Sequence, residues 1–180
     1  MTKLLSTEQM AEFANSGCLF FEGLIDEDIN KEFLNDIGHT DIHDVDNIQH
    51  YFQNIKSSSS IPRIPAGTAL KDAYPLNSPL EKIFKNEIVS GAINSLVGSK
   101  TVVDHQFLHL TFPSKYYAKA NQRQMSQVNH QDSTIDPRTT FDIQLFYFPT
   151  AVTKEMGGTR YIPGTHLRIV NEMGIAKYQN

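Results

Sequence analysis

A histidine and an aspartate two residues apart, His130 and Asp132, form the pattern in this chain with the clearest chemical meaning. They stand in Asn129-His130-Gln131-Asp132, shortly before a strand-like run at 141–148. Alternate side chains of an extended backbone point to one side, so this spacing places an imidazole nitrogen beside a carboxylate oxygen. Such a pair supplies two of the three protein ligands of a two-histidine, one-carboxylate iron(II) site. The second histidine must come from elsewhere in the chain.

The same spacing occurs a second time, so the pattern proves little alone. His39-Thr40-Asp41 also fits, in a polar stretch with further possible ligands: His43, Asp44, Asp46 and His50. We interpret that cluster as a solvated loop, because no rigid strand there fixes ligand geometry; opportunistic metal binding is the alternative. For His130 and Asp132, motif and context alone leave two readings open: a metal site, or a histidine hydrogen-bonded to its neighbouring aspartate.

Composition indicates one folded, soluble domain. The chain has 180 residues, of which 39% are apolar, enough for a sizeable core. Its net charge is −4 and its basic residues are spread out, which disfavours nucleic acid and anionic membranes as partners. The single Cys18 excludes an internal disulfide and fits a reducing compartment. No signal peptide or transmembrane-length apolar run is present, so we expect a cytoplasmic protein.

Helices are expected first and strands later. Three helices are predicted at 6–17, 26–38 and 78–98, each ending at a glycine, and the first and third open on N-capping sequences. Residues 39–77 have no clear period and predict a long irregular excursion. Strands are predicted at 18–21, 101–112, 128–133, 141–148 and 159–162. This order favours an α+β fold that is mainly β, with helices on one side of an antiparallel sheet system.

A second motif runs from Gly157 to His166, with the sequence GGTRYIPGTH. Two glycines permit a tight turn, and a Pro-Gly turn closes the short strand that follows. Together with His130-Gln131-Asp132, this motif resembles the phytanoyl-CoA dioxygenase family of iron(II)/2-oxoglutarate oxygenases. The N-terminal run 5–20 also resembles the family's opening helix and first strand, so the resemblance covers the whole chain in order.

The resemblance implies a double-stranded β-helix, a cupin-like jelly roll, formed as a single domain over residues 1–180. Residues 1–98 would supply a helical buttress and an irregular loop, and residues 99–180 the strands that carry the metal motif. It further implies iron(II) and 2-oxoglutarate as cofactors, a small organic substrate that is hydroxylated, and His130 and Asp132 as metal ligands.

In that family the second histidine ligand and an arginine that pairs with 2-oxoglutarate lie downstream of the Pro-Gly-Thr-His turn. No histidine follows His166. We therefore expect the third ligand beyond Asn180, a jelly roll that is incomplete at its C-terminus, and little or no turnover by these 180 residues. His166 is the alternative third ligand, although the corresponding histidine of the family belongs to a structural turn.

Four further residues are candidates for the 2-oxoglutarate pocket: Gln144, Phe146, His109 and Arg160. Gln144 and Phe146 alternate on one predicted strand, where core packing explains Phe146 equally well. A sheet-face histidine bonded to its neighbours is the alternative for His109. The guanidinium of Arg160 suits a dicarboxylate because it donates two parallel hydrogen bonds, and a solvent-facing charge is the alternative.

An incomplete jelly roll would leave strand edges and apolar side chains uncovered. We therefore expect a homo-oligomer, formed through an exposed sheet edge, that buries 141–148 or 101–112. The rival to the oxygenase is a non-catalytic jelly-roll module for binding or interaction, in which the motifs survive as structure. Iron-dependent formation of succinate from 2-oxoglutarate discriminates between the two.

Overall fold

A computed structural model of the chain describes residues 2–39, 61–109, 142–156 and 158–167. The chain divides into two compact units. The larger unit comprises Met1–Leu5, Phe21–Leu110 and Leu145–Ala151. The smaller unit comprises Ser6–Phe20, Thr111–Gln144 and Val152–Asn180. The predicted strand at 128–133 lies outside the described residues.

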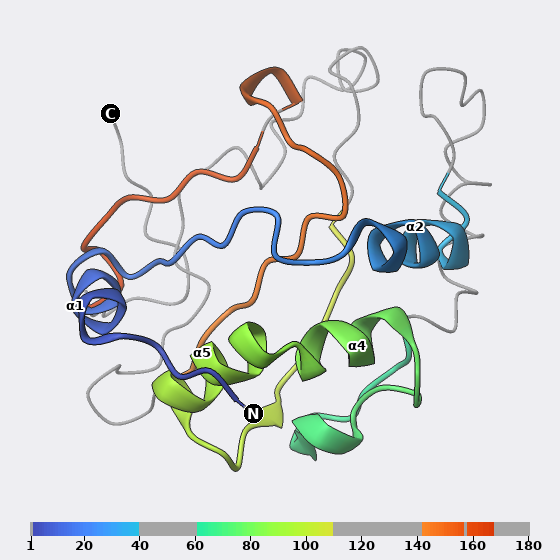
Figure 1. Ribbon diagram of the computed structural model, residues 1–180, viewed down its shortest axis with the longest axis horizontal. Helices are drawn as coiled ribbons and strands as arrows, with labels where there is room; N and C mark the ends of the chain where they lie inside the picture. The colour runs from blue at the N-terminus through green and yellow to red at the C-terminus, as the bar shows by residue number, and fades with distance from the viewer. Residues whose placement is uncertain (1, 40–60, 110–141, 157, 168–180) are drawn as a thin grey trace, which may run out of the picture. The chain divides into compact units, whose positions relative to one another are not determined.

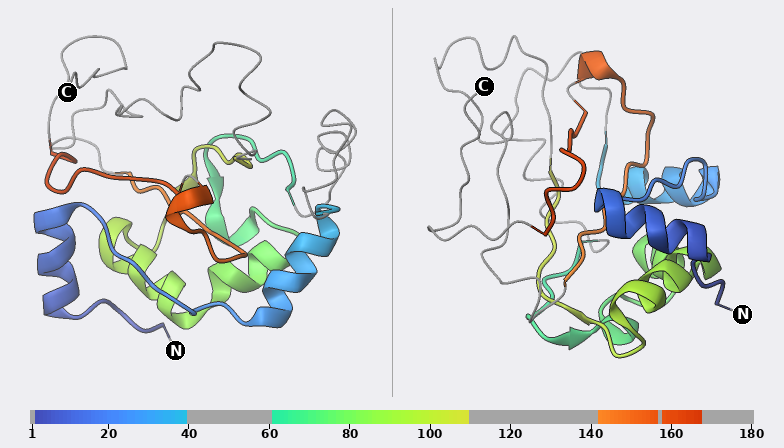
Figure 2. Two further views of the ribbon diagram at one scale, coloured as in Figure 1. Left: turned by 90° about the horizontal axis from the view of Figure 1, so that it is seen from above. Right: turned by 90° about the vertical axis from the view of Figure 1, so that its left-hand side faces the viewer.

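The larger unit is built on three helices: α2 (Glu27–Asp36), α4 (Pro79–Lys85) and α5 (Glu87–Val97). Helix α2 packs against α4, and α4 continues end to end into α5 (Figures 1 and 2). Removing apolar side chains from water drives this packing. The most buried large apolar side chains, 2–7% exposed, are those of Phe33, Ile37, Ile83, Val89 and Ile93. The predicted helix at 26–38 is confirmed, with Asp26 at its N-cap.

The predicted helix at 78–98 is in fact two helices. The backbone leaves the helical region at Asn86, with φ −52° and ψ 132°. The Asn86 side chain accepts hydrogen bonds from the amides of Ile88 (2.9 Å) and Val89 (3.3 Å) and so begins a new helix there. The apolar residues continue at helical spacing on both sides of Asn86, so the sequence predicted a single helix. The predicted end at Gly98 is confirmed, with φ 85°.

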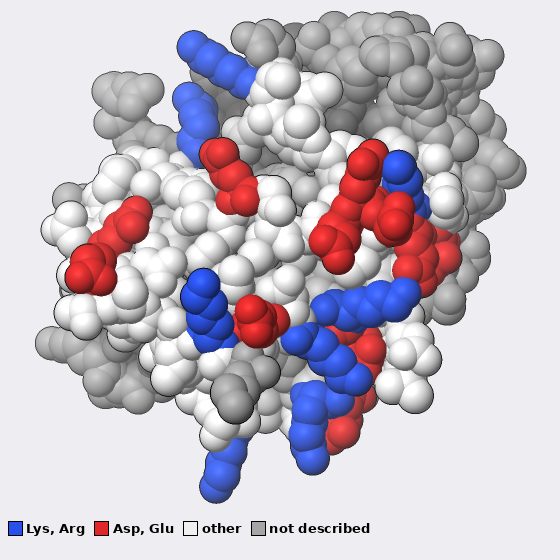
Figure 3. Space-filling model, viewed as in Figure 1, with Lys and Arg blue, Asp and Glu red and all other residues white. Residues whose placement is uncertain are grey.

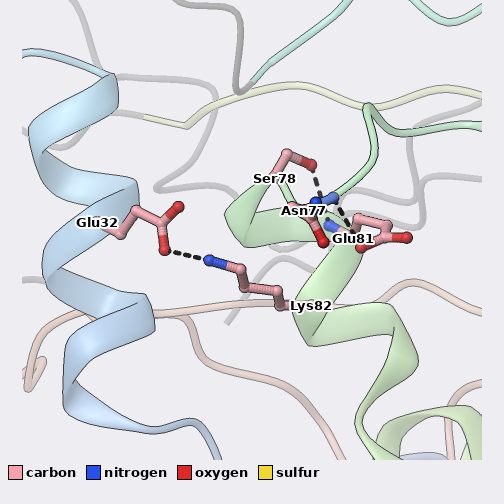
Figure 4. Close-up of polar contacts among 5 residues, drawn as sticks. All are labelled: Glu32, Asn77, Ser78, Glu81 and Lys82. Atoms are coloured by element: carbon pink, nitrogen blue, oxygen red, sulfur yellow. Dashed lines mark hydrogen bonds and ion pairs between the residues drawn. The ribbon is translucent and has the colours of Figure 1, made fainter.

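The start of α4 is the N-cap that the sequence predicted (Figure 4). Ser78 Oγ accepts a hydrogen bond from the Glu81 amide at 3.3 Å, and Pro79 occupies the first turn, where no amide donor is needed. The Glu81 carboxylate accepts from the Asn77 amide at 3.1 Å, which holds Asn77 in a left-handed conformation. Lys82, the next residue after Glu81, forms an ion pair of 2.5 Å with Glu32 of α2.

The described strands form one two-stranded sheet. Strand β1 (Thr68–Ala69) pairs antiparallel with β2 (Val102–Val103), with Thr68 opposite Val103. The ladder extends at each end, where the Gly67 amide donates to Val103 O and the Leu70 amide to Thr101 O. The 3₁₀ helix η2 (Leu70–Asp72) follows β1. Residues 61–77 therefore carry regular elements inside a stretch that the sequence predicted to be irregular.

Most of the predicted strand residues that the structure describes are not strands. Residues 18–21, 104–109, 142–148 and 159–162 are all assigned to irregular backbone. A strand requires a hydrogen-bonded neighbour, which its own sequence does not specify. Only β1 and β2 find one within the described parts of the chain. The strand predictions were therefore wrong for these residues, although their alternating composition is real.

The smaller unit opens on α1 (Thr7–Ser16). The predicted capping box is present: the Gln9 amide donates to Ser6 Oγ (3.2 Å) and the Ser6 amide to Gln9 Oε1 (3.0 Å). The helix ends, as predicted, at Gly17, whose φ of 81° favours glycine. A short 3₁₀ helix, η5 (Lys154–Met156), precedes the second motif.

None of the helices in the described ranges combines the length and the apolar character that crossing a membrane requires.

Candidate functional site

The proposed metal ligands, His130 and Asp132, lie outside the described residues. Their donor set of one imidazole nitrogen and one carboxylate oxygen is a chemical match for iron(II). His39 is described, but the rest of the second His-x-Asp cluster is not. Within the described ranges, no three His, Cys, Asp or Glu side chains gather closely enough to hold a metal ion.

His166, the alternative third ligand, packs against α1 in the smaller unit. Its ring lies 6.3 Å from that of Phe13, measured between centroids. It also covers Gly17 so closely that a Cβ atom there would stand 2.4 Å from His166 Nδ1. Nδ1 is buried and has no hydrogen-bond partner among the described residues. Gly17 therefore serves two purposes, a left-handed helix end and room for this ring.

The Pro-Gly-Thr-His turn is joined to α1 by its backbone as well. The Gly164 amide donates to Ser16 O at 2.9 Å, and Gly164 itself has φ 75°. The Thr165 hydroxyl donates to Ile162 O at 2.8 Å and closes the turn. The turn and the first helix are far apart in sequence, yet they form one packed structure in the smaller unit.

The candidate pocket residue His109 lies in an exposed aromatic row in the larger unit. The rings of residues 105, 107 and 109 follow one another, with the Phe107 ring 5.9 Å from that of His105 and 6.4 Å from that of His109, measured between centroids. Phe107 is 65% exposed. His105 Nδ1 lies 2.7 Å from a carboxylate oxygen of Asp104. His105 is therefore bonded to its neighbouring aspartate.

The remaining pocket candidates are exposed. Phe146 is 58% exposed and stacks on Phe148 with ring centroids 6.4 Å apart, so the core-packing alternative for Phe146 is wrong in the described structure. Gln144 and Arg160 are also exposed. Gln144 and Arg160 belong to the smaller unit, whereas His109 and Phe146 belong to the larger one.

Two inward contacts, which the sequence did not reveal, hold the row of 104–109 in place. The Tyr74 hydroxyl donates to Gln106 Oε1 at 3.0 Å, and Gln106 Nε2 donates to Pro62 O. Tyr74 stacks on Phe84 of α4 at 4.9 Å. Burial raises the pKa of Tyr74 to about 12, so its hydroxyl remains a donor.

A similar anchor holds 145–148. The Tyr147 hydroxyl donates to Asn30 Oδ1 of α2 at 2.6 Å, and the Tyr147 ring meets the Phe33 ring edge-on at 5.3 Å. Burial raises the pKa of Tyr147 to about 12. In the sequence, this anchor is visible only as a tyrosine between two phenylalanines. That pattern does not indicate which distant residue the tyrosine contacts.

The thiol of Cys18 is not an activated nucleophile. Burial, with a smaller effect of Glu12, raises the pKa of the Cys18 thiol, which disfavours the reactive thiolate. Charges of both signs alternate on the face in Figure 3. In the larger unit, ion pairs join Lys31 with Glu27, Lys82 with Glu32, and Lys85 with Glu81.

Comparison with known proteins identifies the class. Residues 13–177 match the phytanoyl-CoA dioxygenase (PhyH) family, a match that spans both units. The chain belongs to this family. Membership supports an oxidoreductase of the dioxygenase type, and the family has a cupin-like fold and is generally dependent on iron(II) and 2-oxoglutarate. Searches of curated proteins and of solved structures found no match.

Proposed function

We propose that this chain is an iron(II)- and 2-oxoglutarate-dependent dioxygenase that hydroxylates a small organic molecule. Family membership over residues 13–177 carries the proposal. The His130-Gln131-Asp132 sequence supports it as well, because it provides the donor types of a two-histidine, one-carboxylate site at a spacing that would place them side by side on an extended backbone.

In this proposal His130 and Asp132 hold the iron. The bound iron and 2-oxoglutarate supply the oxidation of an unactivated C–H bond, and the protein orients the substrate. Arg160 is the candidate partner for the far carboxylate of 2-oxoglutarate, since its side chain is exposed and a guanidinium can donate two parallel hydrogen bonds to a carboxylate. His109, Gln144 and Phe146 are the other candidates for contacts with 2-oxoglutarate.

The packing of His166 bears on its role. Its ring lies over Gly17, and its turn is hydrogen-bonded to Ser16, which gives it a structural task. We therefore assign His166 to positioning the second motif and leave the third metal ligand unassigned.

We also propose that the chain has the cupin-like jelly roll implied by the family, to which residues 99–180 would contribute. The cupin-like fold of the family supports this; the only strand that the described residues of that range form is β2. A reducing, cytoplasmic setting is proposed on the single Cys18.

Succinate formation tests the proposal. Because we expect little turnover, the protein is used at concentrations near those of 2-oxoglutarate, and succinate is counted per chain with and without iron(II). We expect iron-dependent succinate that is lost in His130→Ala and in Asp132→Ala. His39→Ala is the matched control, because His39 begins the other His-x-Asp pattern, and it should keep the signal.

Two results would count against the enzyme. Succinate that survives His130→Ala would remove His130 from the site. Absence of any iron-dependent succinate, in protein that is folded by circular dichroism, would favour the non-catalytic module.

A further inference from the structure

Gly91 occupies the middle of α5, where glycine is an unfavourable residue for a helix. It does not end the helix or take a left-handed conformation, and it is buried. A helix-interior glycine is explained when another part of the chain must approach the backbone closely. The residues that approach are at the N-terminus.

Residues 2–5 run beside α5 as an N-terminal arm (Figure 1). The Lys3 amide donates to Glu87 O at 3.0 Å, and the Leu5 amide donates to Ser95 Oγ at 3.0 Å. Between these two bonds, a Cβ atom built on Gly91 would stand 1.8 Å from Lys3 O and 2.4 Å from Lys3 C. Any side chain at position 91 would therefore displace the backbone of the arm.

The geometry of an α-helix explains why these three positions act together. Residues four apart lie on one stripe, so Glu87, Gly91 and Ser95 form a single track along α5. The buried apolar residues Val89 and Ile93 lie on nearly the opposite side. The arm thus covers the face of α5 that its core contacts leave open.

Backbone groups make the contacts of the arm. The donors of its two hydrogen bonds to α5 are the main-chain amides of Lys3 and Leu5, and the Leu4 side chain is 64% exposed. The track therefore selects an extended backbone rather than a particular sequence.

We propose that residues 2–5 are a strap that locks α5 by seating in the track formed by Glu87, Gly91 and Ser95. Release of this strap, by trimming of the N-terminus or by bulk added at residues 2–5, loosens α5 in the larger unit. The strap is a conformational control on the protein that is independent of the metal site and of the proposed oxygenase activity.

A thermodynamic cycle on the whole chain tests the strap. Four proteins are compared by thermal unfolding: the original chain, Gly91→Ala, a chain lacking residues 2–5, and the combination of both changes. In the original chain, Gly91→Ala forces overpacking and should lower the unfolding midpoint by about 2–12 °C. Without the strap, the same substitution should leave the midpoint unchanged or raise it, because alanine favours the helix. Equal losses in both backgrounds would overturn the proposal.

A second pair of variants tests a single hydrogen bond. Lys3→Pro removes the amide that donates to Glu87 O, and Lys3→Ala keeps it. We expect faster amide hydrogen exchange in α5 for Lys3→Pro and unchanged exchange for Lys3→Ala. Identical exchange in the two variants would show that the strap does not lock the helix.

Discussion

Two parts of the larger unit hold their side chains in different ways. In α4 and α5 the helix ends are capped by Ser78 and Asn86, and apolar side chains such as Ile83 are almost completely buried. Along 104–109 and 145–148 exposed aromatic rings stack on one another. One polar side chain in each segment bonds to a distant residue, Gln106 to Tyr74 and Tyr147 to Asn30 of α2. The helical part is stabilised by burial throughout, whereas the aromatic segments depend on a few anchors.

The largest expected change in the free energy of unfolding comes from removing a buried side chain of the helices rather than an exposed, stacked aromatic ring. Ile83 is 2% exposed, so Ile83→Ala should lower the free energy of unfolding by about 2–5 kcal/mol. Phe107 is 65% exposed, and Phe107→Ala should change it by less than about 0.5 kcal/mol. Denaturant unfolding measures both. Comparable losses would mean that the aromatic row is part of the core.

The anchor at Tyr147 should give an intermediate effect. Tyr147→Phe removes the bond to Asn30 and should cost about 0.5–1.5 kcal/mol at neutral pH, while the exposed Tyr161→Phe should cost nothing measurable. Burial raises the pKa of Tyr147 from 10 to about 12, so folding favours the neutral phenol. Its contribution is complete below pH 10 and is lost as the pH rises from 10 to 12.

Alkaline unfolding curves check this prediction. Tyr147→Phe should lessen the loss of stability above pH 10. Part of the loss should remain, because the pKa of Tyr74 is also raised to about 12. A variant with the same alkaline limb as the original chain would show that the phenol of Tyr147 is not held in the folded state.

Glu81→Gln should change the pH dependence of the free energy of unfolding by a smaller amount, and only at acidic pH. The hydrogen bond from Lys85 is the main cause that lowers the pKa of Glu81 below its ordinary 4.5, and burial opposes it. The contribution is therefore complete above pH 4.5 and is lost as the pH falls through the lower folded value. Glu81→Gln should flatten the acid limb of the stability curve. Glu27→Gln is the control, because the side chains of its ion pair with Lys31 are largely exposed, 81% for Glu27 and 61% for Lys31.

The exposed aromatic rings should matter least for the unfolding free energy and most for assembly. We propose self-association through Phe146 and Phe148, which are 58% and 49% exposed. Light scattering at micromolar concentration should show an oligomer that dissociates in the Phe146→Ser, Phe148→Ser variant without a loss of helix content. A stable monomer in the original chain would refute the proposal.

Helix ends were predictable because capping is local. Ser6 with Gln9, Ser78 with Glu81, and Gly17 each carry their signal within a few residues of the boundary. Asn86 carries the same kind of signal, but the apolar periodicity on either side of it favoured one continuous helix. An N-capping residue inside a regular apolar pattern therefore indicates that one helix ends and another begins there.

Strands and anchors were less predictable because they depend on distant partners. Nothing near Tyr147 names Asn30, and nothing near residues 2–5 names Gly91. The His130-Gln131-Asp132 motif and the turn ending at His166 identified the family, because their residue types and order are specific to its chemistry. The placement of the pocket candidates was not recoverable from alternation alone, since alternation does not tell which face a distant element will cover.

The most direct test of the central claim is metal binding at His130 and Asp132. Calorimetric titration with iron(II) under anaerobic conditions should show one weak site in the original chain, absent in His130→Ala and in Asp132→Ala and retained in His39→Ala. Addition of 2-oxoglutarate should tighten the site if it is the cofactor, because it would supply further oxygen ligands to an iron held by His130 and Asp132. Equal iron binding by the original chain and by His130→Ala would contradict the claim.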